Sequence, residues 1–95
     1  MTTPTSKVAV QAQGAPKRFV FVLLENFTLL SFASAIDSLR IANRMSGDTL
    51  YDWFITGDAD DEGMVSCSSG SRFKVDAPLG ELNRDDVVLL CGGSY

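Results

Sequence analysis

The sequence predicts an α/β fold in which a helix flanks a parallel sheet, and three observations support this. Two unbroken apolar runs, at residues 18–24 and 87–90, are typical of strands buried on both faces of a parallel sheet. Residues 29–45 carry apolar side chains at the three- and four-residue spacing of an amphipathic helix. A further apolar strand at residues 50–56 completes a strand–helix–strand unit, and 95 residues allow one domain at most.

The beginning of the chain differs in composition from the rest. It is rich in Thr, Gln, Ala, Gly and Pro and shows no periodicity. We therefore expect a disordered leader at residues 1–17 and an ordered domain at residues 18–95. The leader lacks the apolar core of a secretory signal, and no apolar run is long enough to cross a bilayer. The sequence predicts a cytoplasmic protein with reduced cysteines and no membrane partner.

The predicted helix has recognisable ends. Thr28 is a candidate N-cap, and Gly47 suits the left-handed residue that terminates many helices. Asp37 and Arg40 lie one turn apart on its polar side, while Arg44 falls in the last turn, where a cation is favoured. This helix would cover one face of the sheet, and we predict no second long helix to cover the other.

The region after the second strand predicts a β-hairpin followed by an irregular connection. Two short segments at residues 64–67 and 72–75 are joined by small polar residues, as in a hairpin. Leu79 and Leu82 suggest a single helical turn before the last strand. The acidic run at residues 58–62 is interpreted as a solvated loop, because it lacks the glycine and the distal glutamate of calcium loops.

Charge and composition exclude some classes of function. The net charge is −4 and the basic residues are scattered, which argues against a nucleic-acid surface. The chain has no histidine, which removes Ser-His-Asp and Cys-His catalysis and the commonest metal ligand. We therefore predict no catalytic residue, no metal site and no cofactor.

Three stretches of sequence carry a resemblance to a known family. They are RFVFVLLENFTLLSFASAIDSLRIANRMSG, LYDWFITG and DDVVLLCGG, which together run from about Arg18 to Gly93. Their order resembles the opening of the ThiJ/PfpI superfamily, which has the class I glutamine amidotransferase-like fold. Within that superfamily they are most similar to the N-terminal domain of GlxA-type regulators of the AraC family, which carry a similar helix ending in LR-AN.

The resemblance implies a flavodoxin-like layout in which helices sandwich a parallel sheet. In the family the domain continues after the Gly-Gly pair with a helix and then a strand that leads to a nucleophile elbow. The regulators add two helix-turn-helix motifs. We therefore expect this chain to be truncated and to hold the first half of such a domain, with the DNA-binding region absent.

The resemblance also implies a ligand pocket at the carboxyl edge of the sheet. Asn26 could bind a ligand amide or carboxylate, or could simply hold the turn. The glycines could let the backbone approach a ligand or could serve a tight turn with positive φ. Catalytic members place a glutamate where this chain has Leu29, which argues against an enzyme. The candidate pocket residues are Asn26, Phe27, Leu29, Gly92 and Gly93.

Cys91 poses a separate question, because it ends an apolar strand just before the Gly-Gly pair. A catalytic cysteine needs a cationic partner or a helix N-terminus to lower its pKa, and the sequence offers neither close to Cys91. The family nucleophile also lies on a later elbow. We interpret Cys91 and Cys67 as structural residues.

These expectations combine into a functional hypothesis. The chain would be a ligand-sensing, non-catalytic part of an AraC-family transcriptional regulator, with an amine or an amino-acid-like molecule as the first candidate effector. It would reach DNA only through the missing C-terminal helix-turn-helix region, and its exposed apolar strand edges predict a homo-oligomer. One alternative is a fragment of a ThiJ/PfpI-type hydrolase or glyoxalase-like enzyme that lacks its nucleophile elbow. Another is a gene fragment with no function of its own.

Overall fold

A computed structural model of the protein describes residues 16–80 and 82–93. The leader predicted for residues 1–17 lies outside this part of the chain except for its last two residues, and Lys17 already belongs to the first strand. The elements follow the predicted order of strand, helix, strand, hairpin and strand. They are β1 (Lys17–Leu23), α2 (Leu29–Ser46), β2 (Tyr51–Gly57), β3 (Met64–Ser66), β4 (Arg72–Lys74) and β5 (Val87–Cys91).

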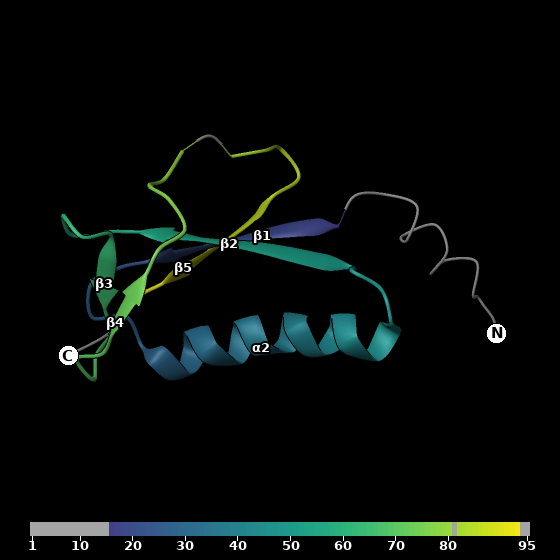
Figure 1. Ribbon diagram of the computed structural model, residues 1–95, viewed down its shortest axis with the longest axis horizontal. Helices are drawn as coiled ribbons and strands as arrows, with labels where there is room; N and C mark the ends of the chain where they lie inside the picture. The colour runs from purple at the N-terminus through teal and green to yellow at the C-terminus, as the bar shows by residue number, and fades with distance from the viewer. Residues whose placement is uncertain (1–15, 81, 94–95) are drawn as a thin grey trace.

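The three long strands form a parallel sheet in the order β2-β1-β5, and β3 and β4 form a separate antiparallel hairpin. Phe21 at the centre of β1 is level with Ile55 on β2 and with Leu89 on β5. Helix α2 lies along one face of this sheet (Figure 1). This confirms the predicted α/β class, and the arrangement is the first part of a flavodoxin-like fold.

The central strand is buried on both sides, as its unbroken apolar sequence predicts. Val20 and Phe21 point to opposite faces of the sheet, and both are fully buried. On β5, however, Val88 and Leu90 are exposed on the face away from α2. The segment between β4 and β5 arches over part of that second face (Figure 1). A loop therefore covers part of the second face, whereas α2 covers the first.

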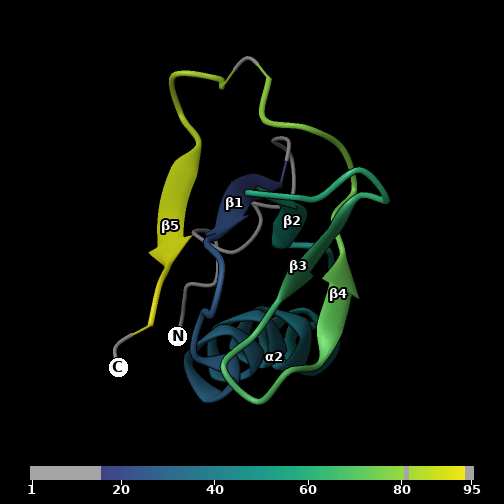
Figure 2. The ribbon, with the colours of Figure 1, turned by 90° about the vertical axis from the view of Figure 1, so that its left-hand side faces the viewer.

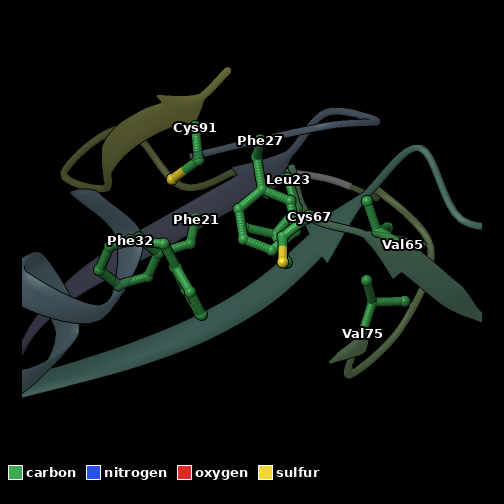
Figure 3. Close-up of a cluster of buried hydrophobic side chains, with 8 residues drawn as sticks. All are labelled: Phe21, Leu23, Phe27, Phe32, Val65, Cys67, Val75 and Cys91. Carbon is green, nitrogen blue, oxygen red and sulfur yellow. The ribbon is translucent and has the colours of Figure 1, made fainter. Parts of the chain in front are cut away.

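The core lies between the sheet, α2 and the hairpin (Figure 3). Phe27 and Phe32 meet edge to face with ring centroids 5.7 Å apart, and Phe73 of the hairpin meets both rings. Such edge-to-face contacts add to the stabilisation from burial alone. The fully or nearly buried members of the cluster are Phe21, Leu23, Phe27, Phe32, Val65, Cys67, Val75 and Cys91.

Helix α2 ends as predicted, but its N-terminus differs in detail. Gly47 adopts φ 75° and its N–H donates to the carbonyls of Asn43 and Arg44, which is the left-handed termination expected for glycine. Thr28 occupies the N-cap position, yet its side chain makes no capping hydrogen bond. Asp37 accepts a hydrogen bond from Arg40 at 2.8 Å on the exposed side of the helix, as the one-turn spacing predicted.

The outer edge of β2 is occupied by side chains. The N–H groups of Tyr51, Trp53 and Ile55 point away from β1, and each donates to a side-chain oxygen at 2.7–2.9 Å. The acceptors are Asn43 on α2, Asp52 on the strand itself and Asp76 beyond β4. The outer edge of β5 has no such partners among the described residues. The two edges of the sheet are therefore unequal.

The predicted helical turn at Leu79 and Leu82 is wrong for the described residues, since neither leucine lies in a helix. The connection is instead held by Asp86, whose carboxylate accepts the N–H of Asn83 at 2.8 Å. The same carboxylate accepts two hydrogen bonds from the Arg18 guanidinium, at 3.1 and 3.2 Å. These bonds attach the connection to β1.

The Asp86 contacts predict a specific dependence of stability on pH. The Asn83 N–H and the Arg18 guanidinium hold the pKa of Asp86 below its ordinary value. A carboxyl group whose pKa falls on folding stabilises the protein above its unfolded pKa of about 3.9, and loses that contribution as the pH falls through the folded value. We expect Asp86→Asn to be less stable than the wild type at pH 7, with the difference shrinking below about pH 4.

Thermal melts at a series of pH values would measure this effect. Asp85→Asn is the matched control, because it removes the same charge from the neighbouring exposed position. A difference between wild type and Asp86→Asn that stays constant from pH 7 to pH 3 would contradict the proposed role of the ionised carboxylate.

Candidate ligand site at the carboxyl edge of the sheet

The carboxyl ends of β1 and β5 meet at the start of α2. The N–H of Leu24, which follows β1, donates to the carbonyl of Cys91 at 3.0 Å. Four residues later, the N–H of Thr28 donates to the carbonyl of Gly92 at the same distance. The turn between β1 and α2 is therefore fastened to the end of β5. In open α/β sheets this edge is where ligands bind.

Gly93 is required here by a close contact between backbones. A Cβ atom added to Gly93 would lie 2.1 Å from the carbonyl oxygen of Asn26, closer than any side chain tolerates. The expectation that the Gly-Gly pair serves a turn with positive φ is wrong, since neither glycine adopts such a φ. Gly92 has room for a side chain, with only Leu24 Cδ1 nearby at 3.8 Å.

Asn26 holds the turn through its backbone. Its φ is 68°, in the left-handed region that asparagine tolerates better than most residues. Its N–H donates to the carbonyl of Ser66 in the hairpin at 2.8 Å. The Asn26 side chain is exposed and makes no hydrogen bond to any described residue. Both roles weighed from the sequence are therefore compatible with the structure, because the backbone shapes the turn and the amide remains free.

Phe27 and Leu29 lie beneath the site. The Phe27 side chain is fully buried, so it supports the turn from inside and presents no surface to a ligand. Leu29 is half-buried and packs against the same core. Of the five candidate residues, Asn26, Gly92 and Gly93 are exposed at the edge.

The hairpin forms one side of this site, which the sequence did not reveal. Its Ser68 N–H donates to the Phe27 carbonyl at 2.8 Å, and Phe27 and Cys67 form an isolated parallel bridge. Figure 2 shows β3 and β4 beside the start of α2. The small polar residues of the turn indicated that a hairpin exists, but they carry no signal of what it packs against.

The two cysteines are free and buried. Burial raises the pKa of the Cys91 thiol, which favours the neutral, weakly nucleophilic form. A hydrogen bond with Ser69 lowers the pKa of Cys67, but its side chain is buried behind the hairpin turn. The interpretation of both as structural residues agrees with these positions, which Figure 3 shows within the core.

The acidic run is an exposed loop, as expected, and its carboxylates also form ion pairs and hydrogen bonds. Arg72 of β4 forms ion pairs with Asp60 and with Glu62, and Asp60 also accepts the N–H groups of Glu62 and Met64. Beside it lies an open hollow of about 380 Å³, which was not predicted. Its lining is Gly57, Ala59, Asp60, Asp61, Gly63, Lys74, Val75, Asp76, Ala77 and Pro78.

No helix within residues 16–80 and 82–93 is long and apolar enough to cross a bilayer. Among the same residues, no group of three or more metal-binding side chains comes together.

The chain is similar to part of three curated transcriptional regulators. It is 40% identical over 93 residues to the HTH-type transcriptional regulator GbdR of Pseudomonas aeruginosa, covering 98% of this chain and 24% of that protein. It is 36% identical over 75 residues to the HTH-type regulator CdhR of the same species, covering 79% of this chain and 21% of the relative. It is 44% identical over 77 residues to the HTH-type regulator GlxA of Rhizobium meliloti, covering 81% and 23% respectively.

The matched region is a small part of each relative. The chain spans about a quarter of the length of the curated relatives that it matches. No family model matches it. No solved structure matches it either. The chain is thus related, across a quarter of their length, to the HTH-type transcriptional regulators of the GlxA group.

Proposed function

We propose that the chain supplies the effector-sensing part of a transcriptional regulator, and that the effector binds where β1, β5 and α2 meet. The observation that carries this is the arrangement at that edge, where the turn before α2 and the end of β5 are hydrogen-bonded to each other. A ligand that contacts both segments would change how they are held together, and so could favour one arrangement of the domain over another.

The chemistry of the edge fits a small polar effector. Asn26 offers an amide that can both donate and accept hydrogen bonds, and the residues after β5 present backbone rather than bulky side chains. The first N–H groups of α2 also point toward this edge, and helix N-termini favour carboxylates. Among the effectors expected from the sequence, a carboxylate-bearing amino acid therefore fits this edge best.

The same residues support sensing rather than catalysis. Leu29 begins α2 at the position where the catalytic relatives implied by the resemblance carry a glutamate. Leucine has no group that could exchange a proton or bind a thiolate. The buried thiol of Cys91 is likewise held in its neutral form. The alternative of a hydrolase fragment is therefore less well supported, because position 29 carries no acid and the Cys91 thiol is held neutral.

DNA binding would require elements beyond those described. A helix-turn-helix places two helices against each other, and the described residues contain a single helix. With a net charge of −4, this chain also lacks the basic surface that phosphates need. We infer that the chain acts on DNA only through another part of a regulator.

Nuclear magnetic resonance titration of the ¹⁵N-labelled chain would test the proposal. Amino acids and alkylamines would be the ligands, and dicarboxylates without an amine the comparison. We expect amide shifts in residues 24–31 and 91–93. Shifts confined to the hollow beside Lys74, or no shift with any compound, would refute the proposed site.

A substitution at Gly92 would test the same proposal by mutation. Gly92→Val adds a side chain at the edge where the backbone has room for it. It should weaken binding at least about tenfold while leaving the melting temperature nearly unchanged, a loss of about 1.4 kcal/mol in binding free energy. Gly80→Val, at an open position in the loop, is the matched control and should bind like the wild type.

A further inference from the structure

Glu25 places a carboxylate on the turn that forms the proposed effector site. It lies between Leu24, which is hydrogen-bonded to the end of β5, and the exposed Asn26. The Glu25 side chain is exposed, and its Oε1 accepts a hydrogen bond from the Ser66 N–H of the hairpin. That bond is 3.5 Å long, beyond the usual range of about 2.7–3.2 Å. Glu25 is therefore held loosely, and its carboxylate keeps most of its capacity to accept hydrogen bonds.

No cation from the described part of the chain neutralises Glu25. The ion pairs within residues 16–80 and 82–93 use other carboxylates, which are those of Asp37, Asp60, Glu62 and Asp86. Asp60 and Glu62, for example, already share the Arg72 guanidinium. The carboxylate of Glu25 is thus available to a cationic group from solution.

The positive end of α2 follows Glu25 along the same turn. Helix α2 has no acidic side chain in its first turn, and its N-cap Thr28 makes no side-chain capping bond. The N–H groups of the first turn therefore keep their attraction for a carboxylate. A small molecule with both an ammonium group and a carboxylate complements the two charges, whereas a carboxylate alone would be repelled by Glu25.

We propose that Glu25 makes the effector site selective for carboxylates that also carry an ammonium group. Its carboxylate binds the ammonium group of the effector and repels acids that lack one. This inference rests on the effector site proposed above and adds a charge requirement to it. Because the ammonium group competes for the same carboxylate, binding would also remove the hydrogen bond from the Ser66 N–H to Glu25.

Titration of the ¹⁵N-labelled 95-residue chain with glycine and with glycolate tests this role. Glycolate has a hydroxyl group in place of the ammonium group of glycine and otherwise has the same skeleton. The wild type should bind glycine at least about tenfold more tightly than glycolate. The Ser66 amide should shift with glycine and much less with glycolate.

Two substitutions of Glu25 separate its charge from its hydrogen bond. Glu25→Gln keeps the length of the side chain and can still accept the Ser66 N–H, but it removes the charge. It should reduce the preference for glycine at least about fivefold, through weaker binding of glycine rather than of glycolate. Glu25→Asp keeps the charge and should keep most of the preference.

Asp85→Asn is the matched control, because it removes the same charge just before β5, at the opposite edge of the sheet. It should leave the preference for glycine within about twofold of the wild type. An equal loss of preference in Asp85→Asn would show that net charge decides selectivity, and would overturn the role of Glu25.

The remaining outcomes distinguish this role from the site itself. If glycine shifts residues 24–31 and 91–93 but Glu25→Gln keeps the full preference, the site stands and the role of Glu25 is overturned. Equal weakening of glycine and glycolate in Glu25→Gln would overturn it as well, as would a wild type that does not prefer glycine. Failure of the site would show instead in the wider titration described above, where no amino acid or amine would shift these residues.

Discussion

Replacing Phe27 by alanine should lower the free energy of unfolding by about 4 kcal/mol, the largest single effect that we expect in this chain. Phe27 is fully buried, and its ring meets the rings of Phe32 on α2 and Phe73 on β4 with centroids 5.7 Å away. Alanine would leave a cavity at the point where the helix, the hairpin and the end of β1 converge. The two surrounding rings come from different elements and cannot both move inward to fill it.

Urea unfolding followed by Trp53 fluorescence would measure this loss. Because small domains are stable by only about 5–15 kcal/mol, the Phe27→Ala chain should show a much lower midpoint and a partly unfolded population in buffer. Leu79→Ala, at an exposed apolar position, should change the free energy of unfolding by less than about 0.5 kcal/mol. A loss of less than about 1 kcal/mol for Phe27→Ala would mean that the aromatic cluster is not a tightly packed core.

Gly57→Ala should be the second most damaging substitution, costing about 3 kcal/mol. The alanine Cβ would lie 2.2 Å from the carbonyl oxygen of Leu23, and Gly57 adopts φ 155°, which side chains disfavour. The Leu23 carbonyl also accepts the N–H of Asp58 at 2.9 Å. Relief of the clash would therefore separate the ends of β1 and β2 and break this hydrogen bond.

Gly80→Ala is the matched control for Gly57→Ala. Nothing lies within 4 Å of a Cβ at that position, so we expect a change of less than about 0.5 kcal/mol. Hydrogen exchange offers a local readout, since the amide of Asp58 should lose protection in Gly57→Ala well before the amides of β5 do. Equal stability of the two variants would show that the ends of β1 and β2 separate without cost.

The sequence predicted the helix and strands whose signals come from residues close together in the chain. The boundaries of α2 followed from apolar spacing and from Gly47, and β1 and β5 followed from unbroken apolar runs. The single helical turn at Leu79 and Leu82 failed because two leucines three residues apart also occur in irregular loops. In the structure, Asp86 holds that connection through side-chain hydrogen bonds, which no local spacing reveals.

The candidate site was predicted only in outline, for a related reason. The resemblance indicated the correct edge of the sheet, but contacts between distant segments decide what each residue does there. Gly93 must be glycine because the Asn26 carbonyl passes beside it, and Phe27 belongs to the core because the hairpin covers it. Both contacts join residues more than 35 positions apart, beyond the reach of periodicity or turn rules.

The unequal edges of the sheet limit how the protein can aggregate. Fibrils grow because every added strand presents a fresh open edge to the next molecule. Here Asn43, Asp52 and Asp76 occupy the N–H groups along the outer side of β2, so a molecule joined through β5 presents a blocked edge. The pairing of folded molecules through their strand edges would therefore stop once two molecules have joined through β5. By blocking the β2 edge, these three side chains would prevent the folded protein from polymerising through its strands.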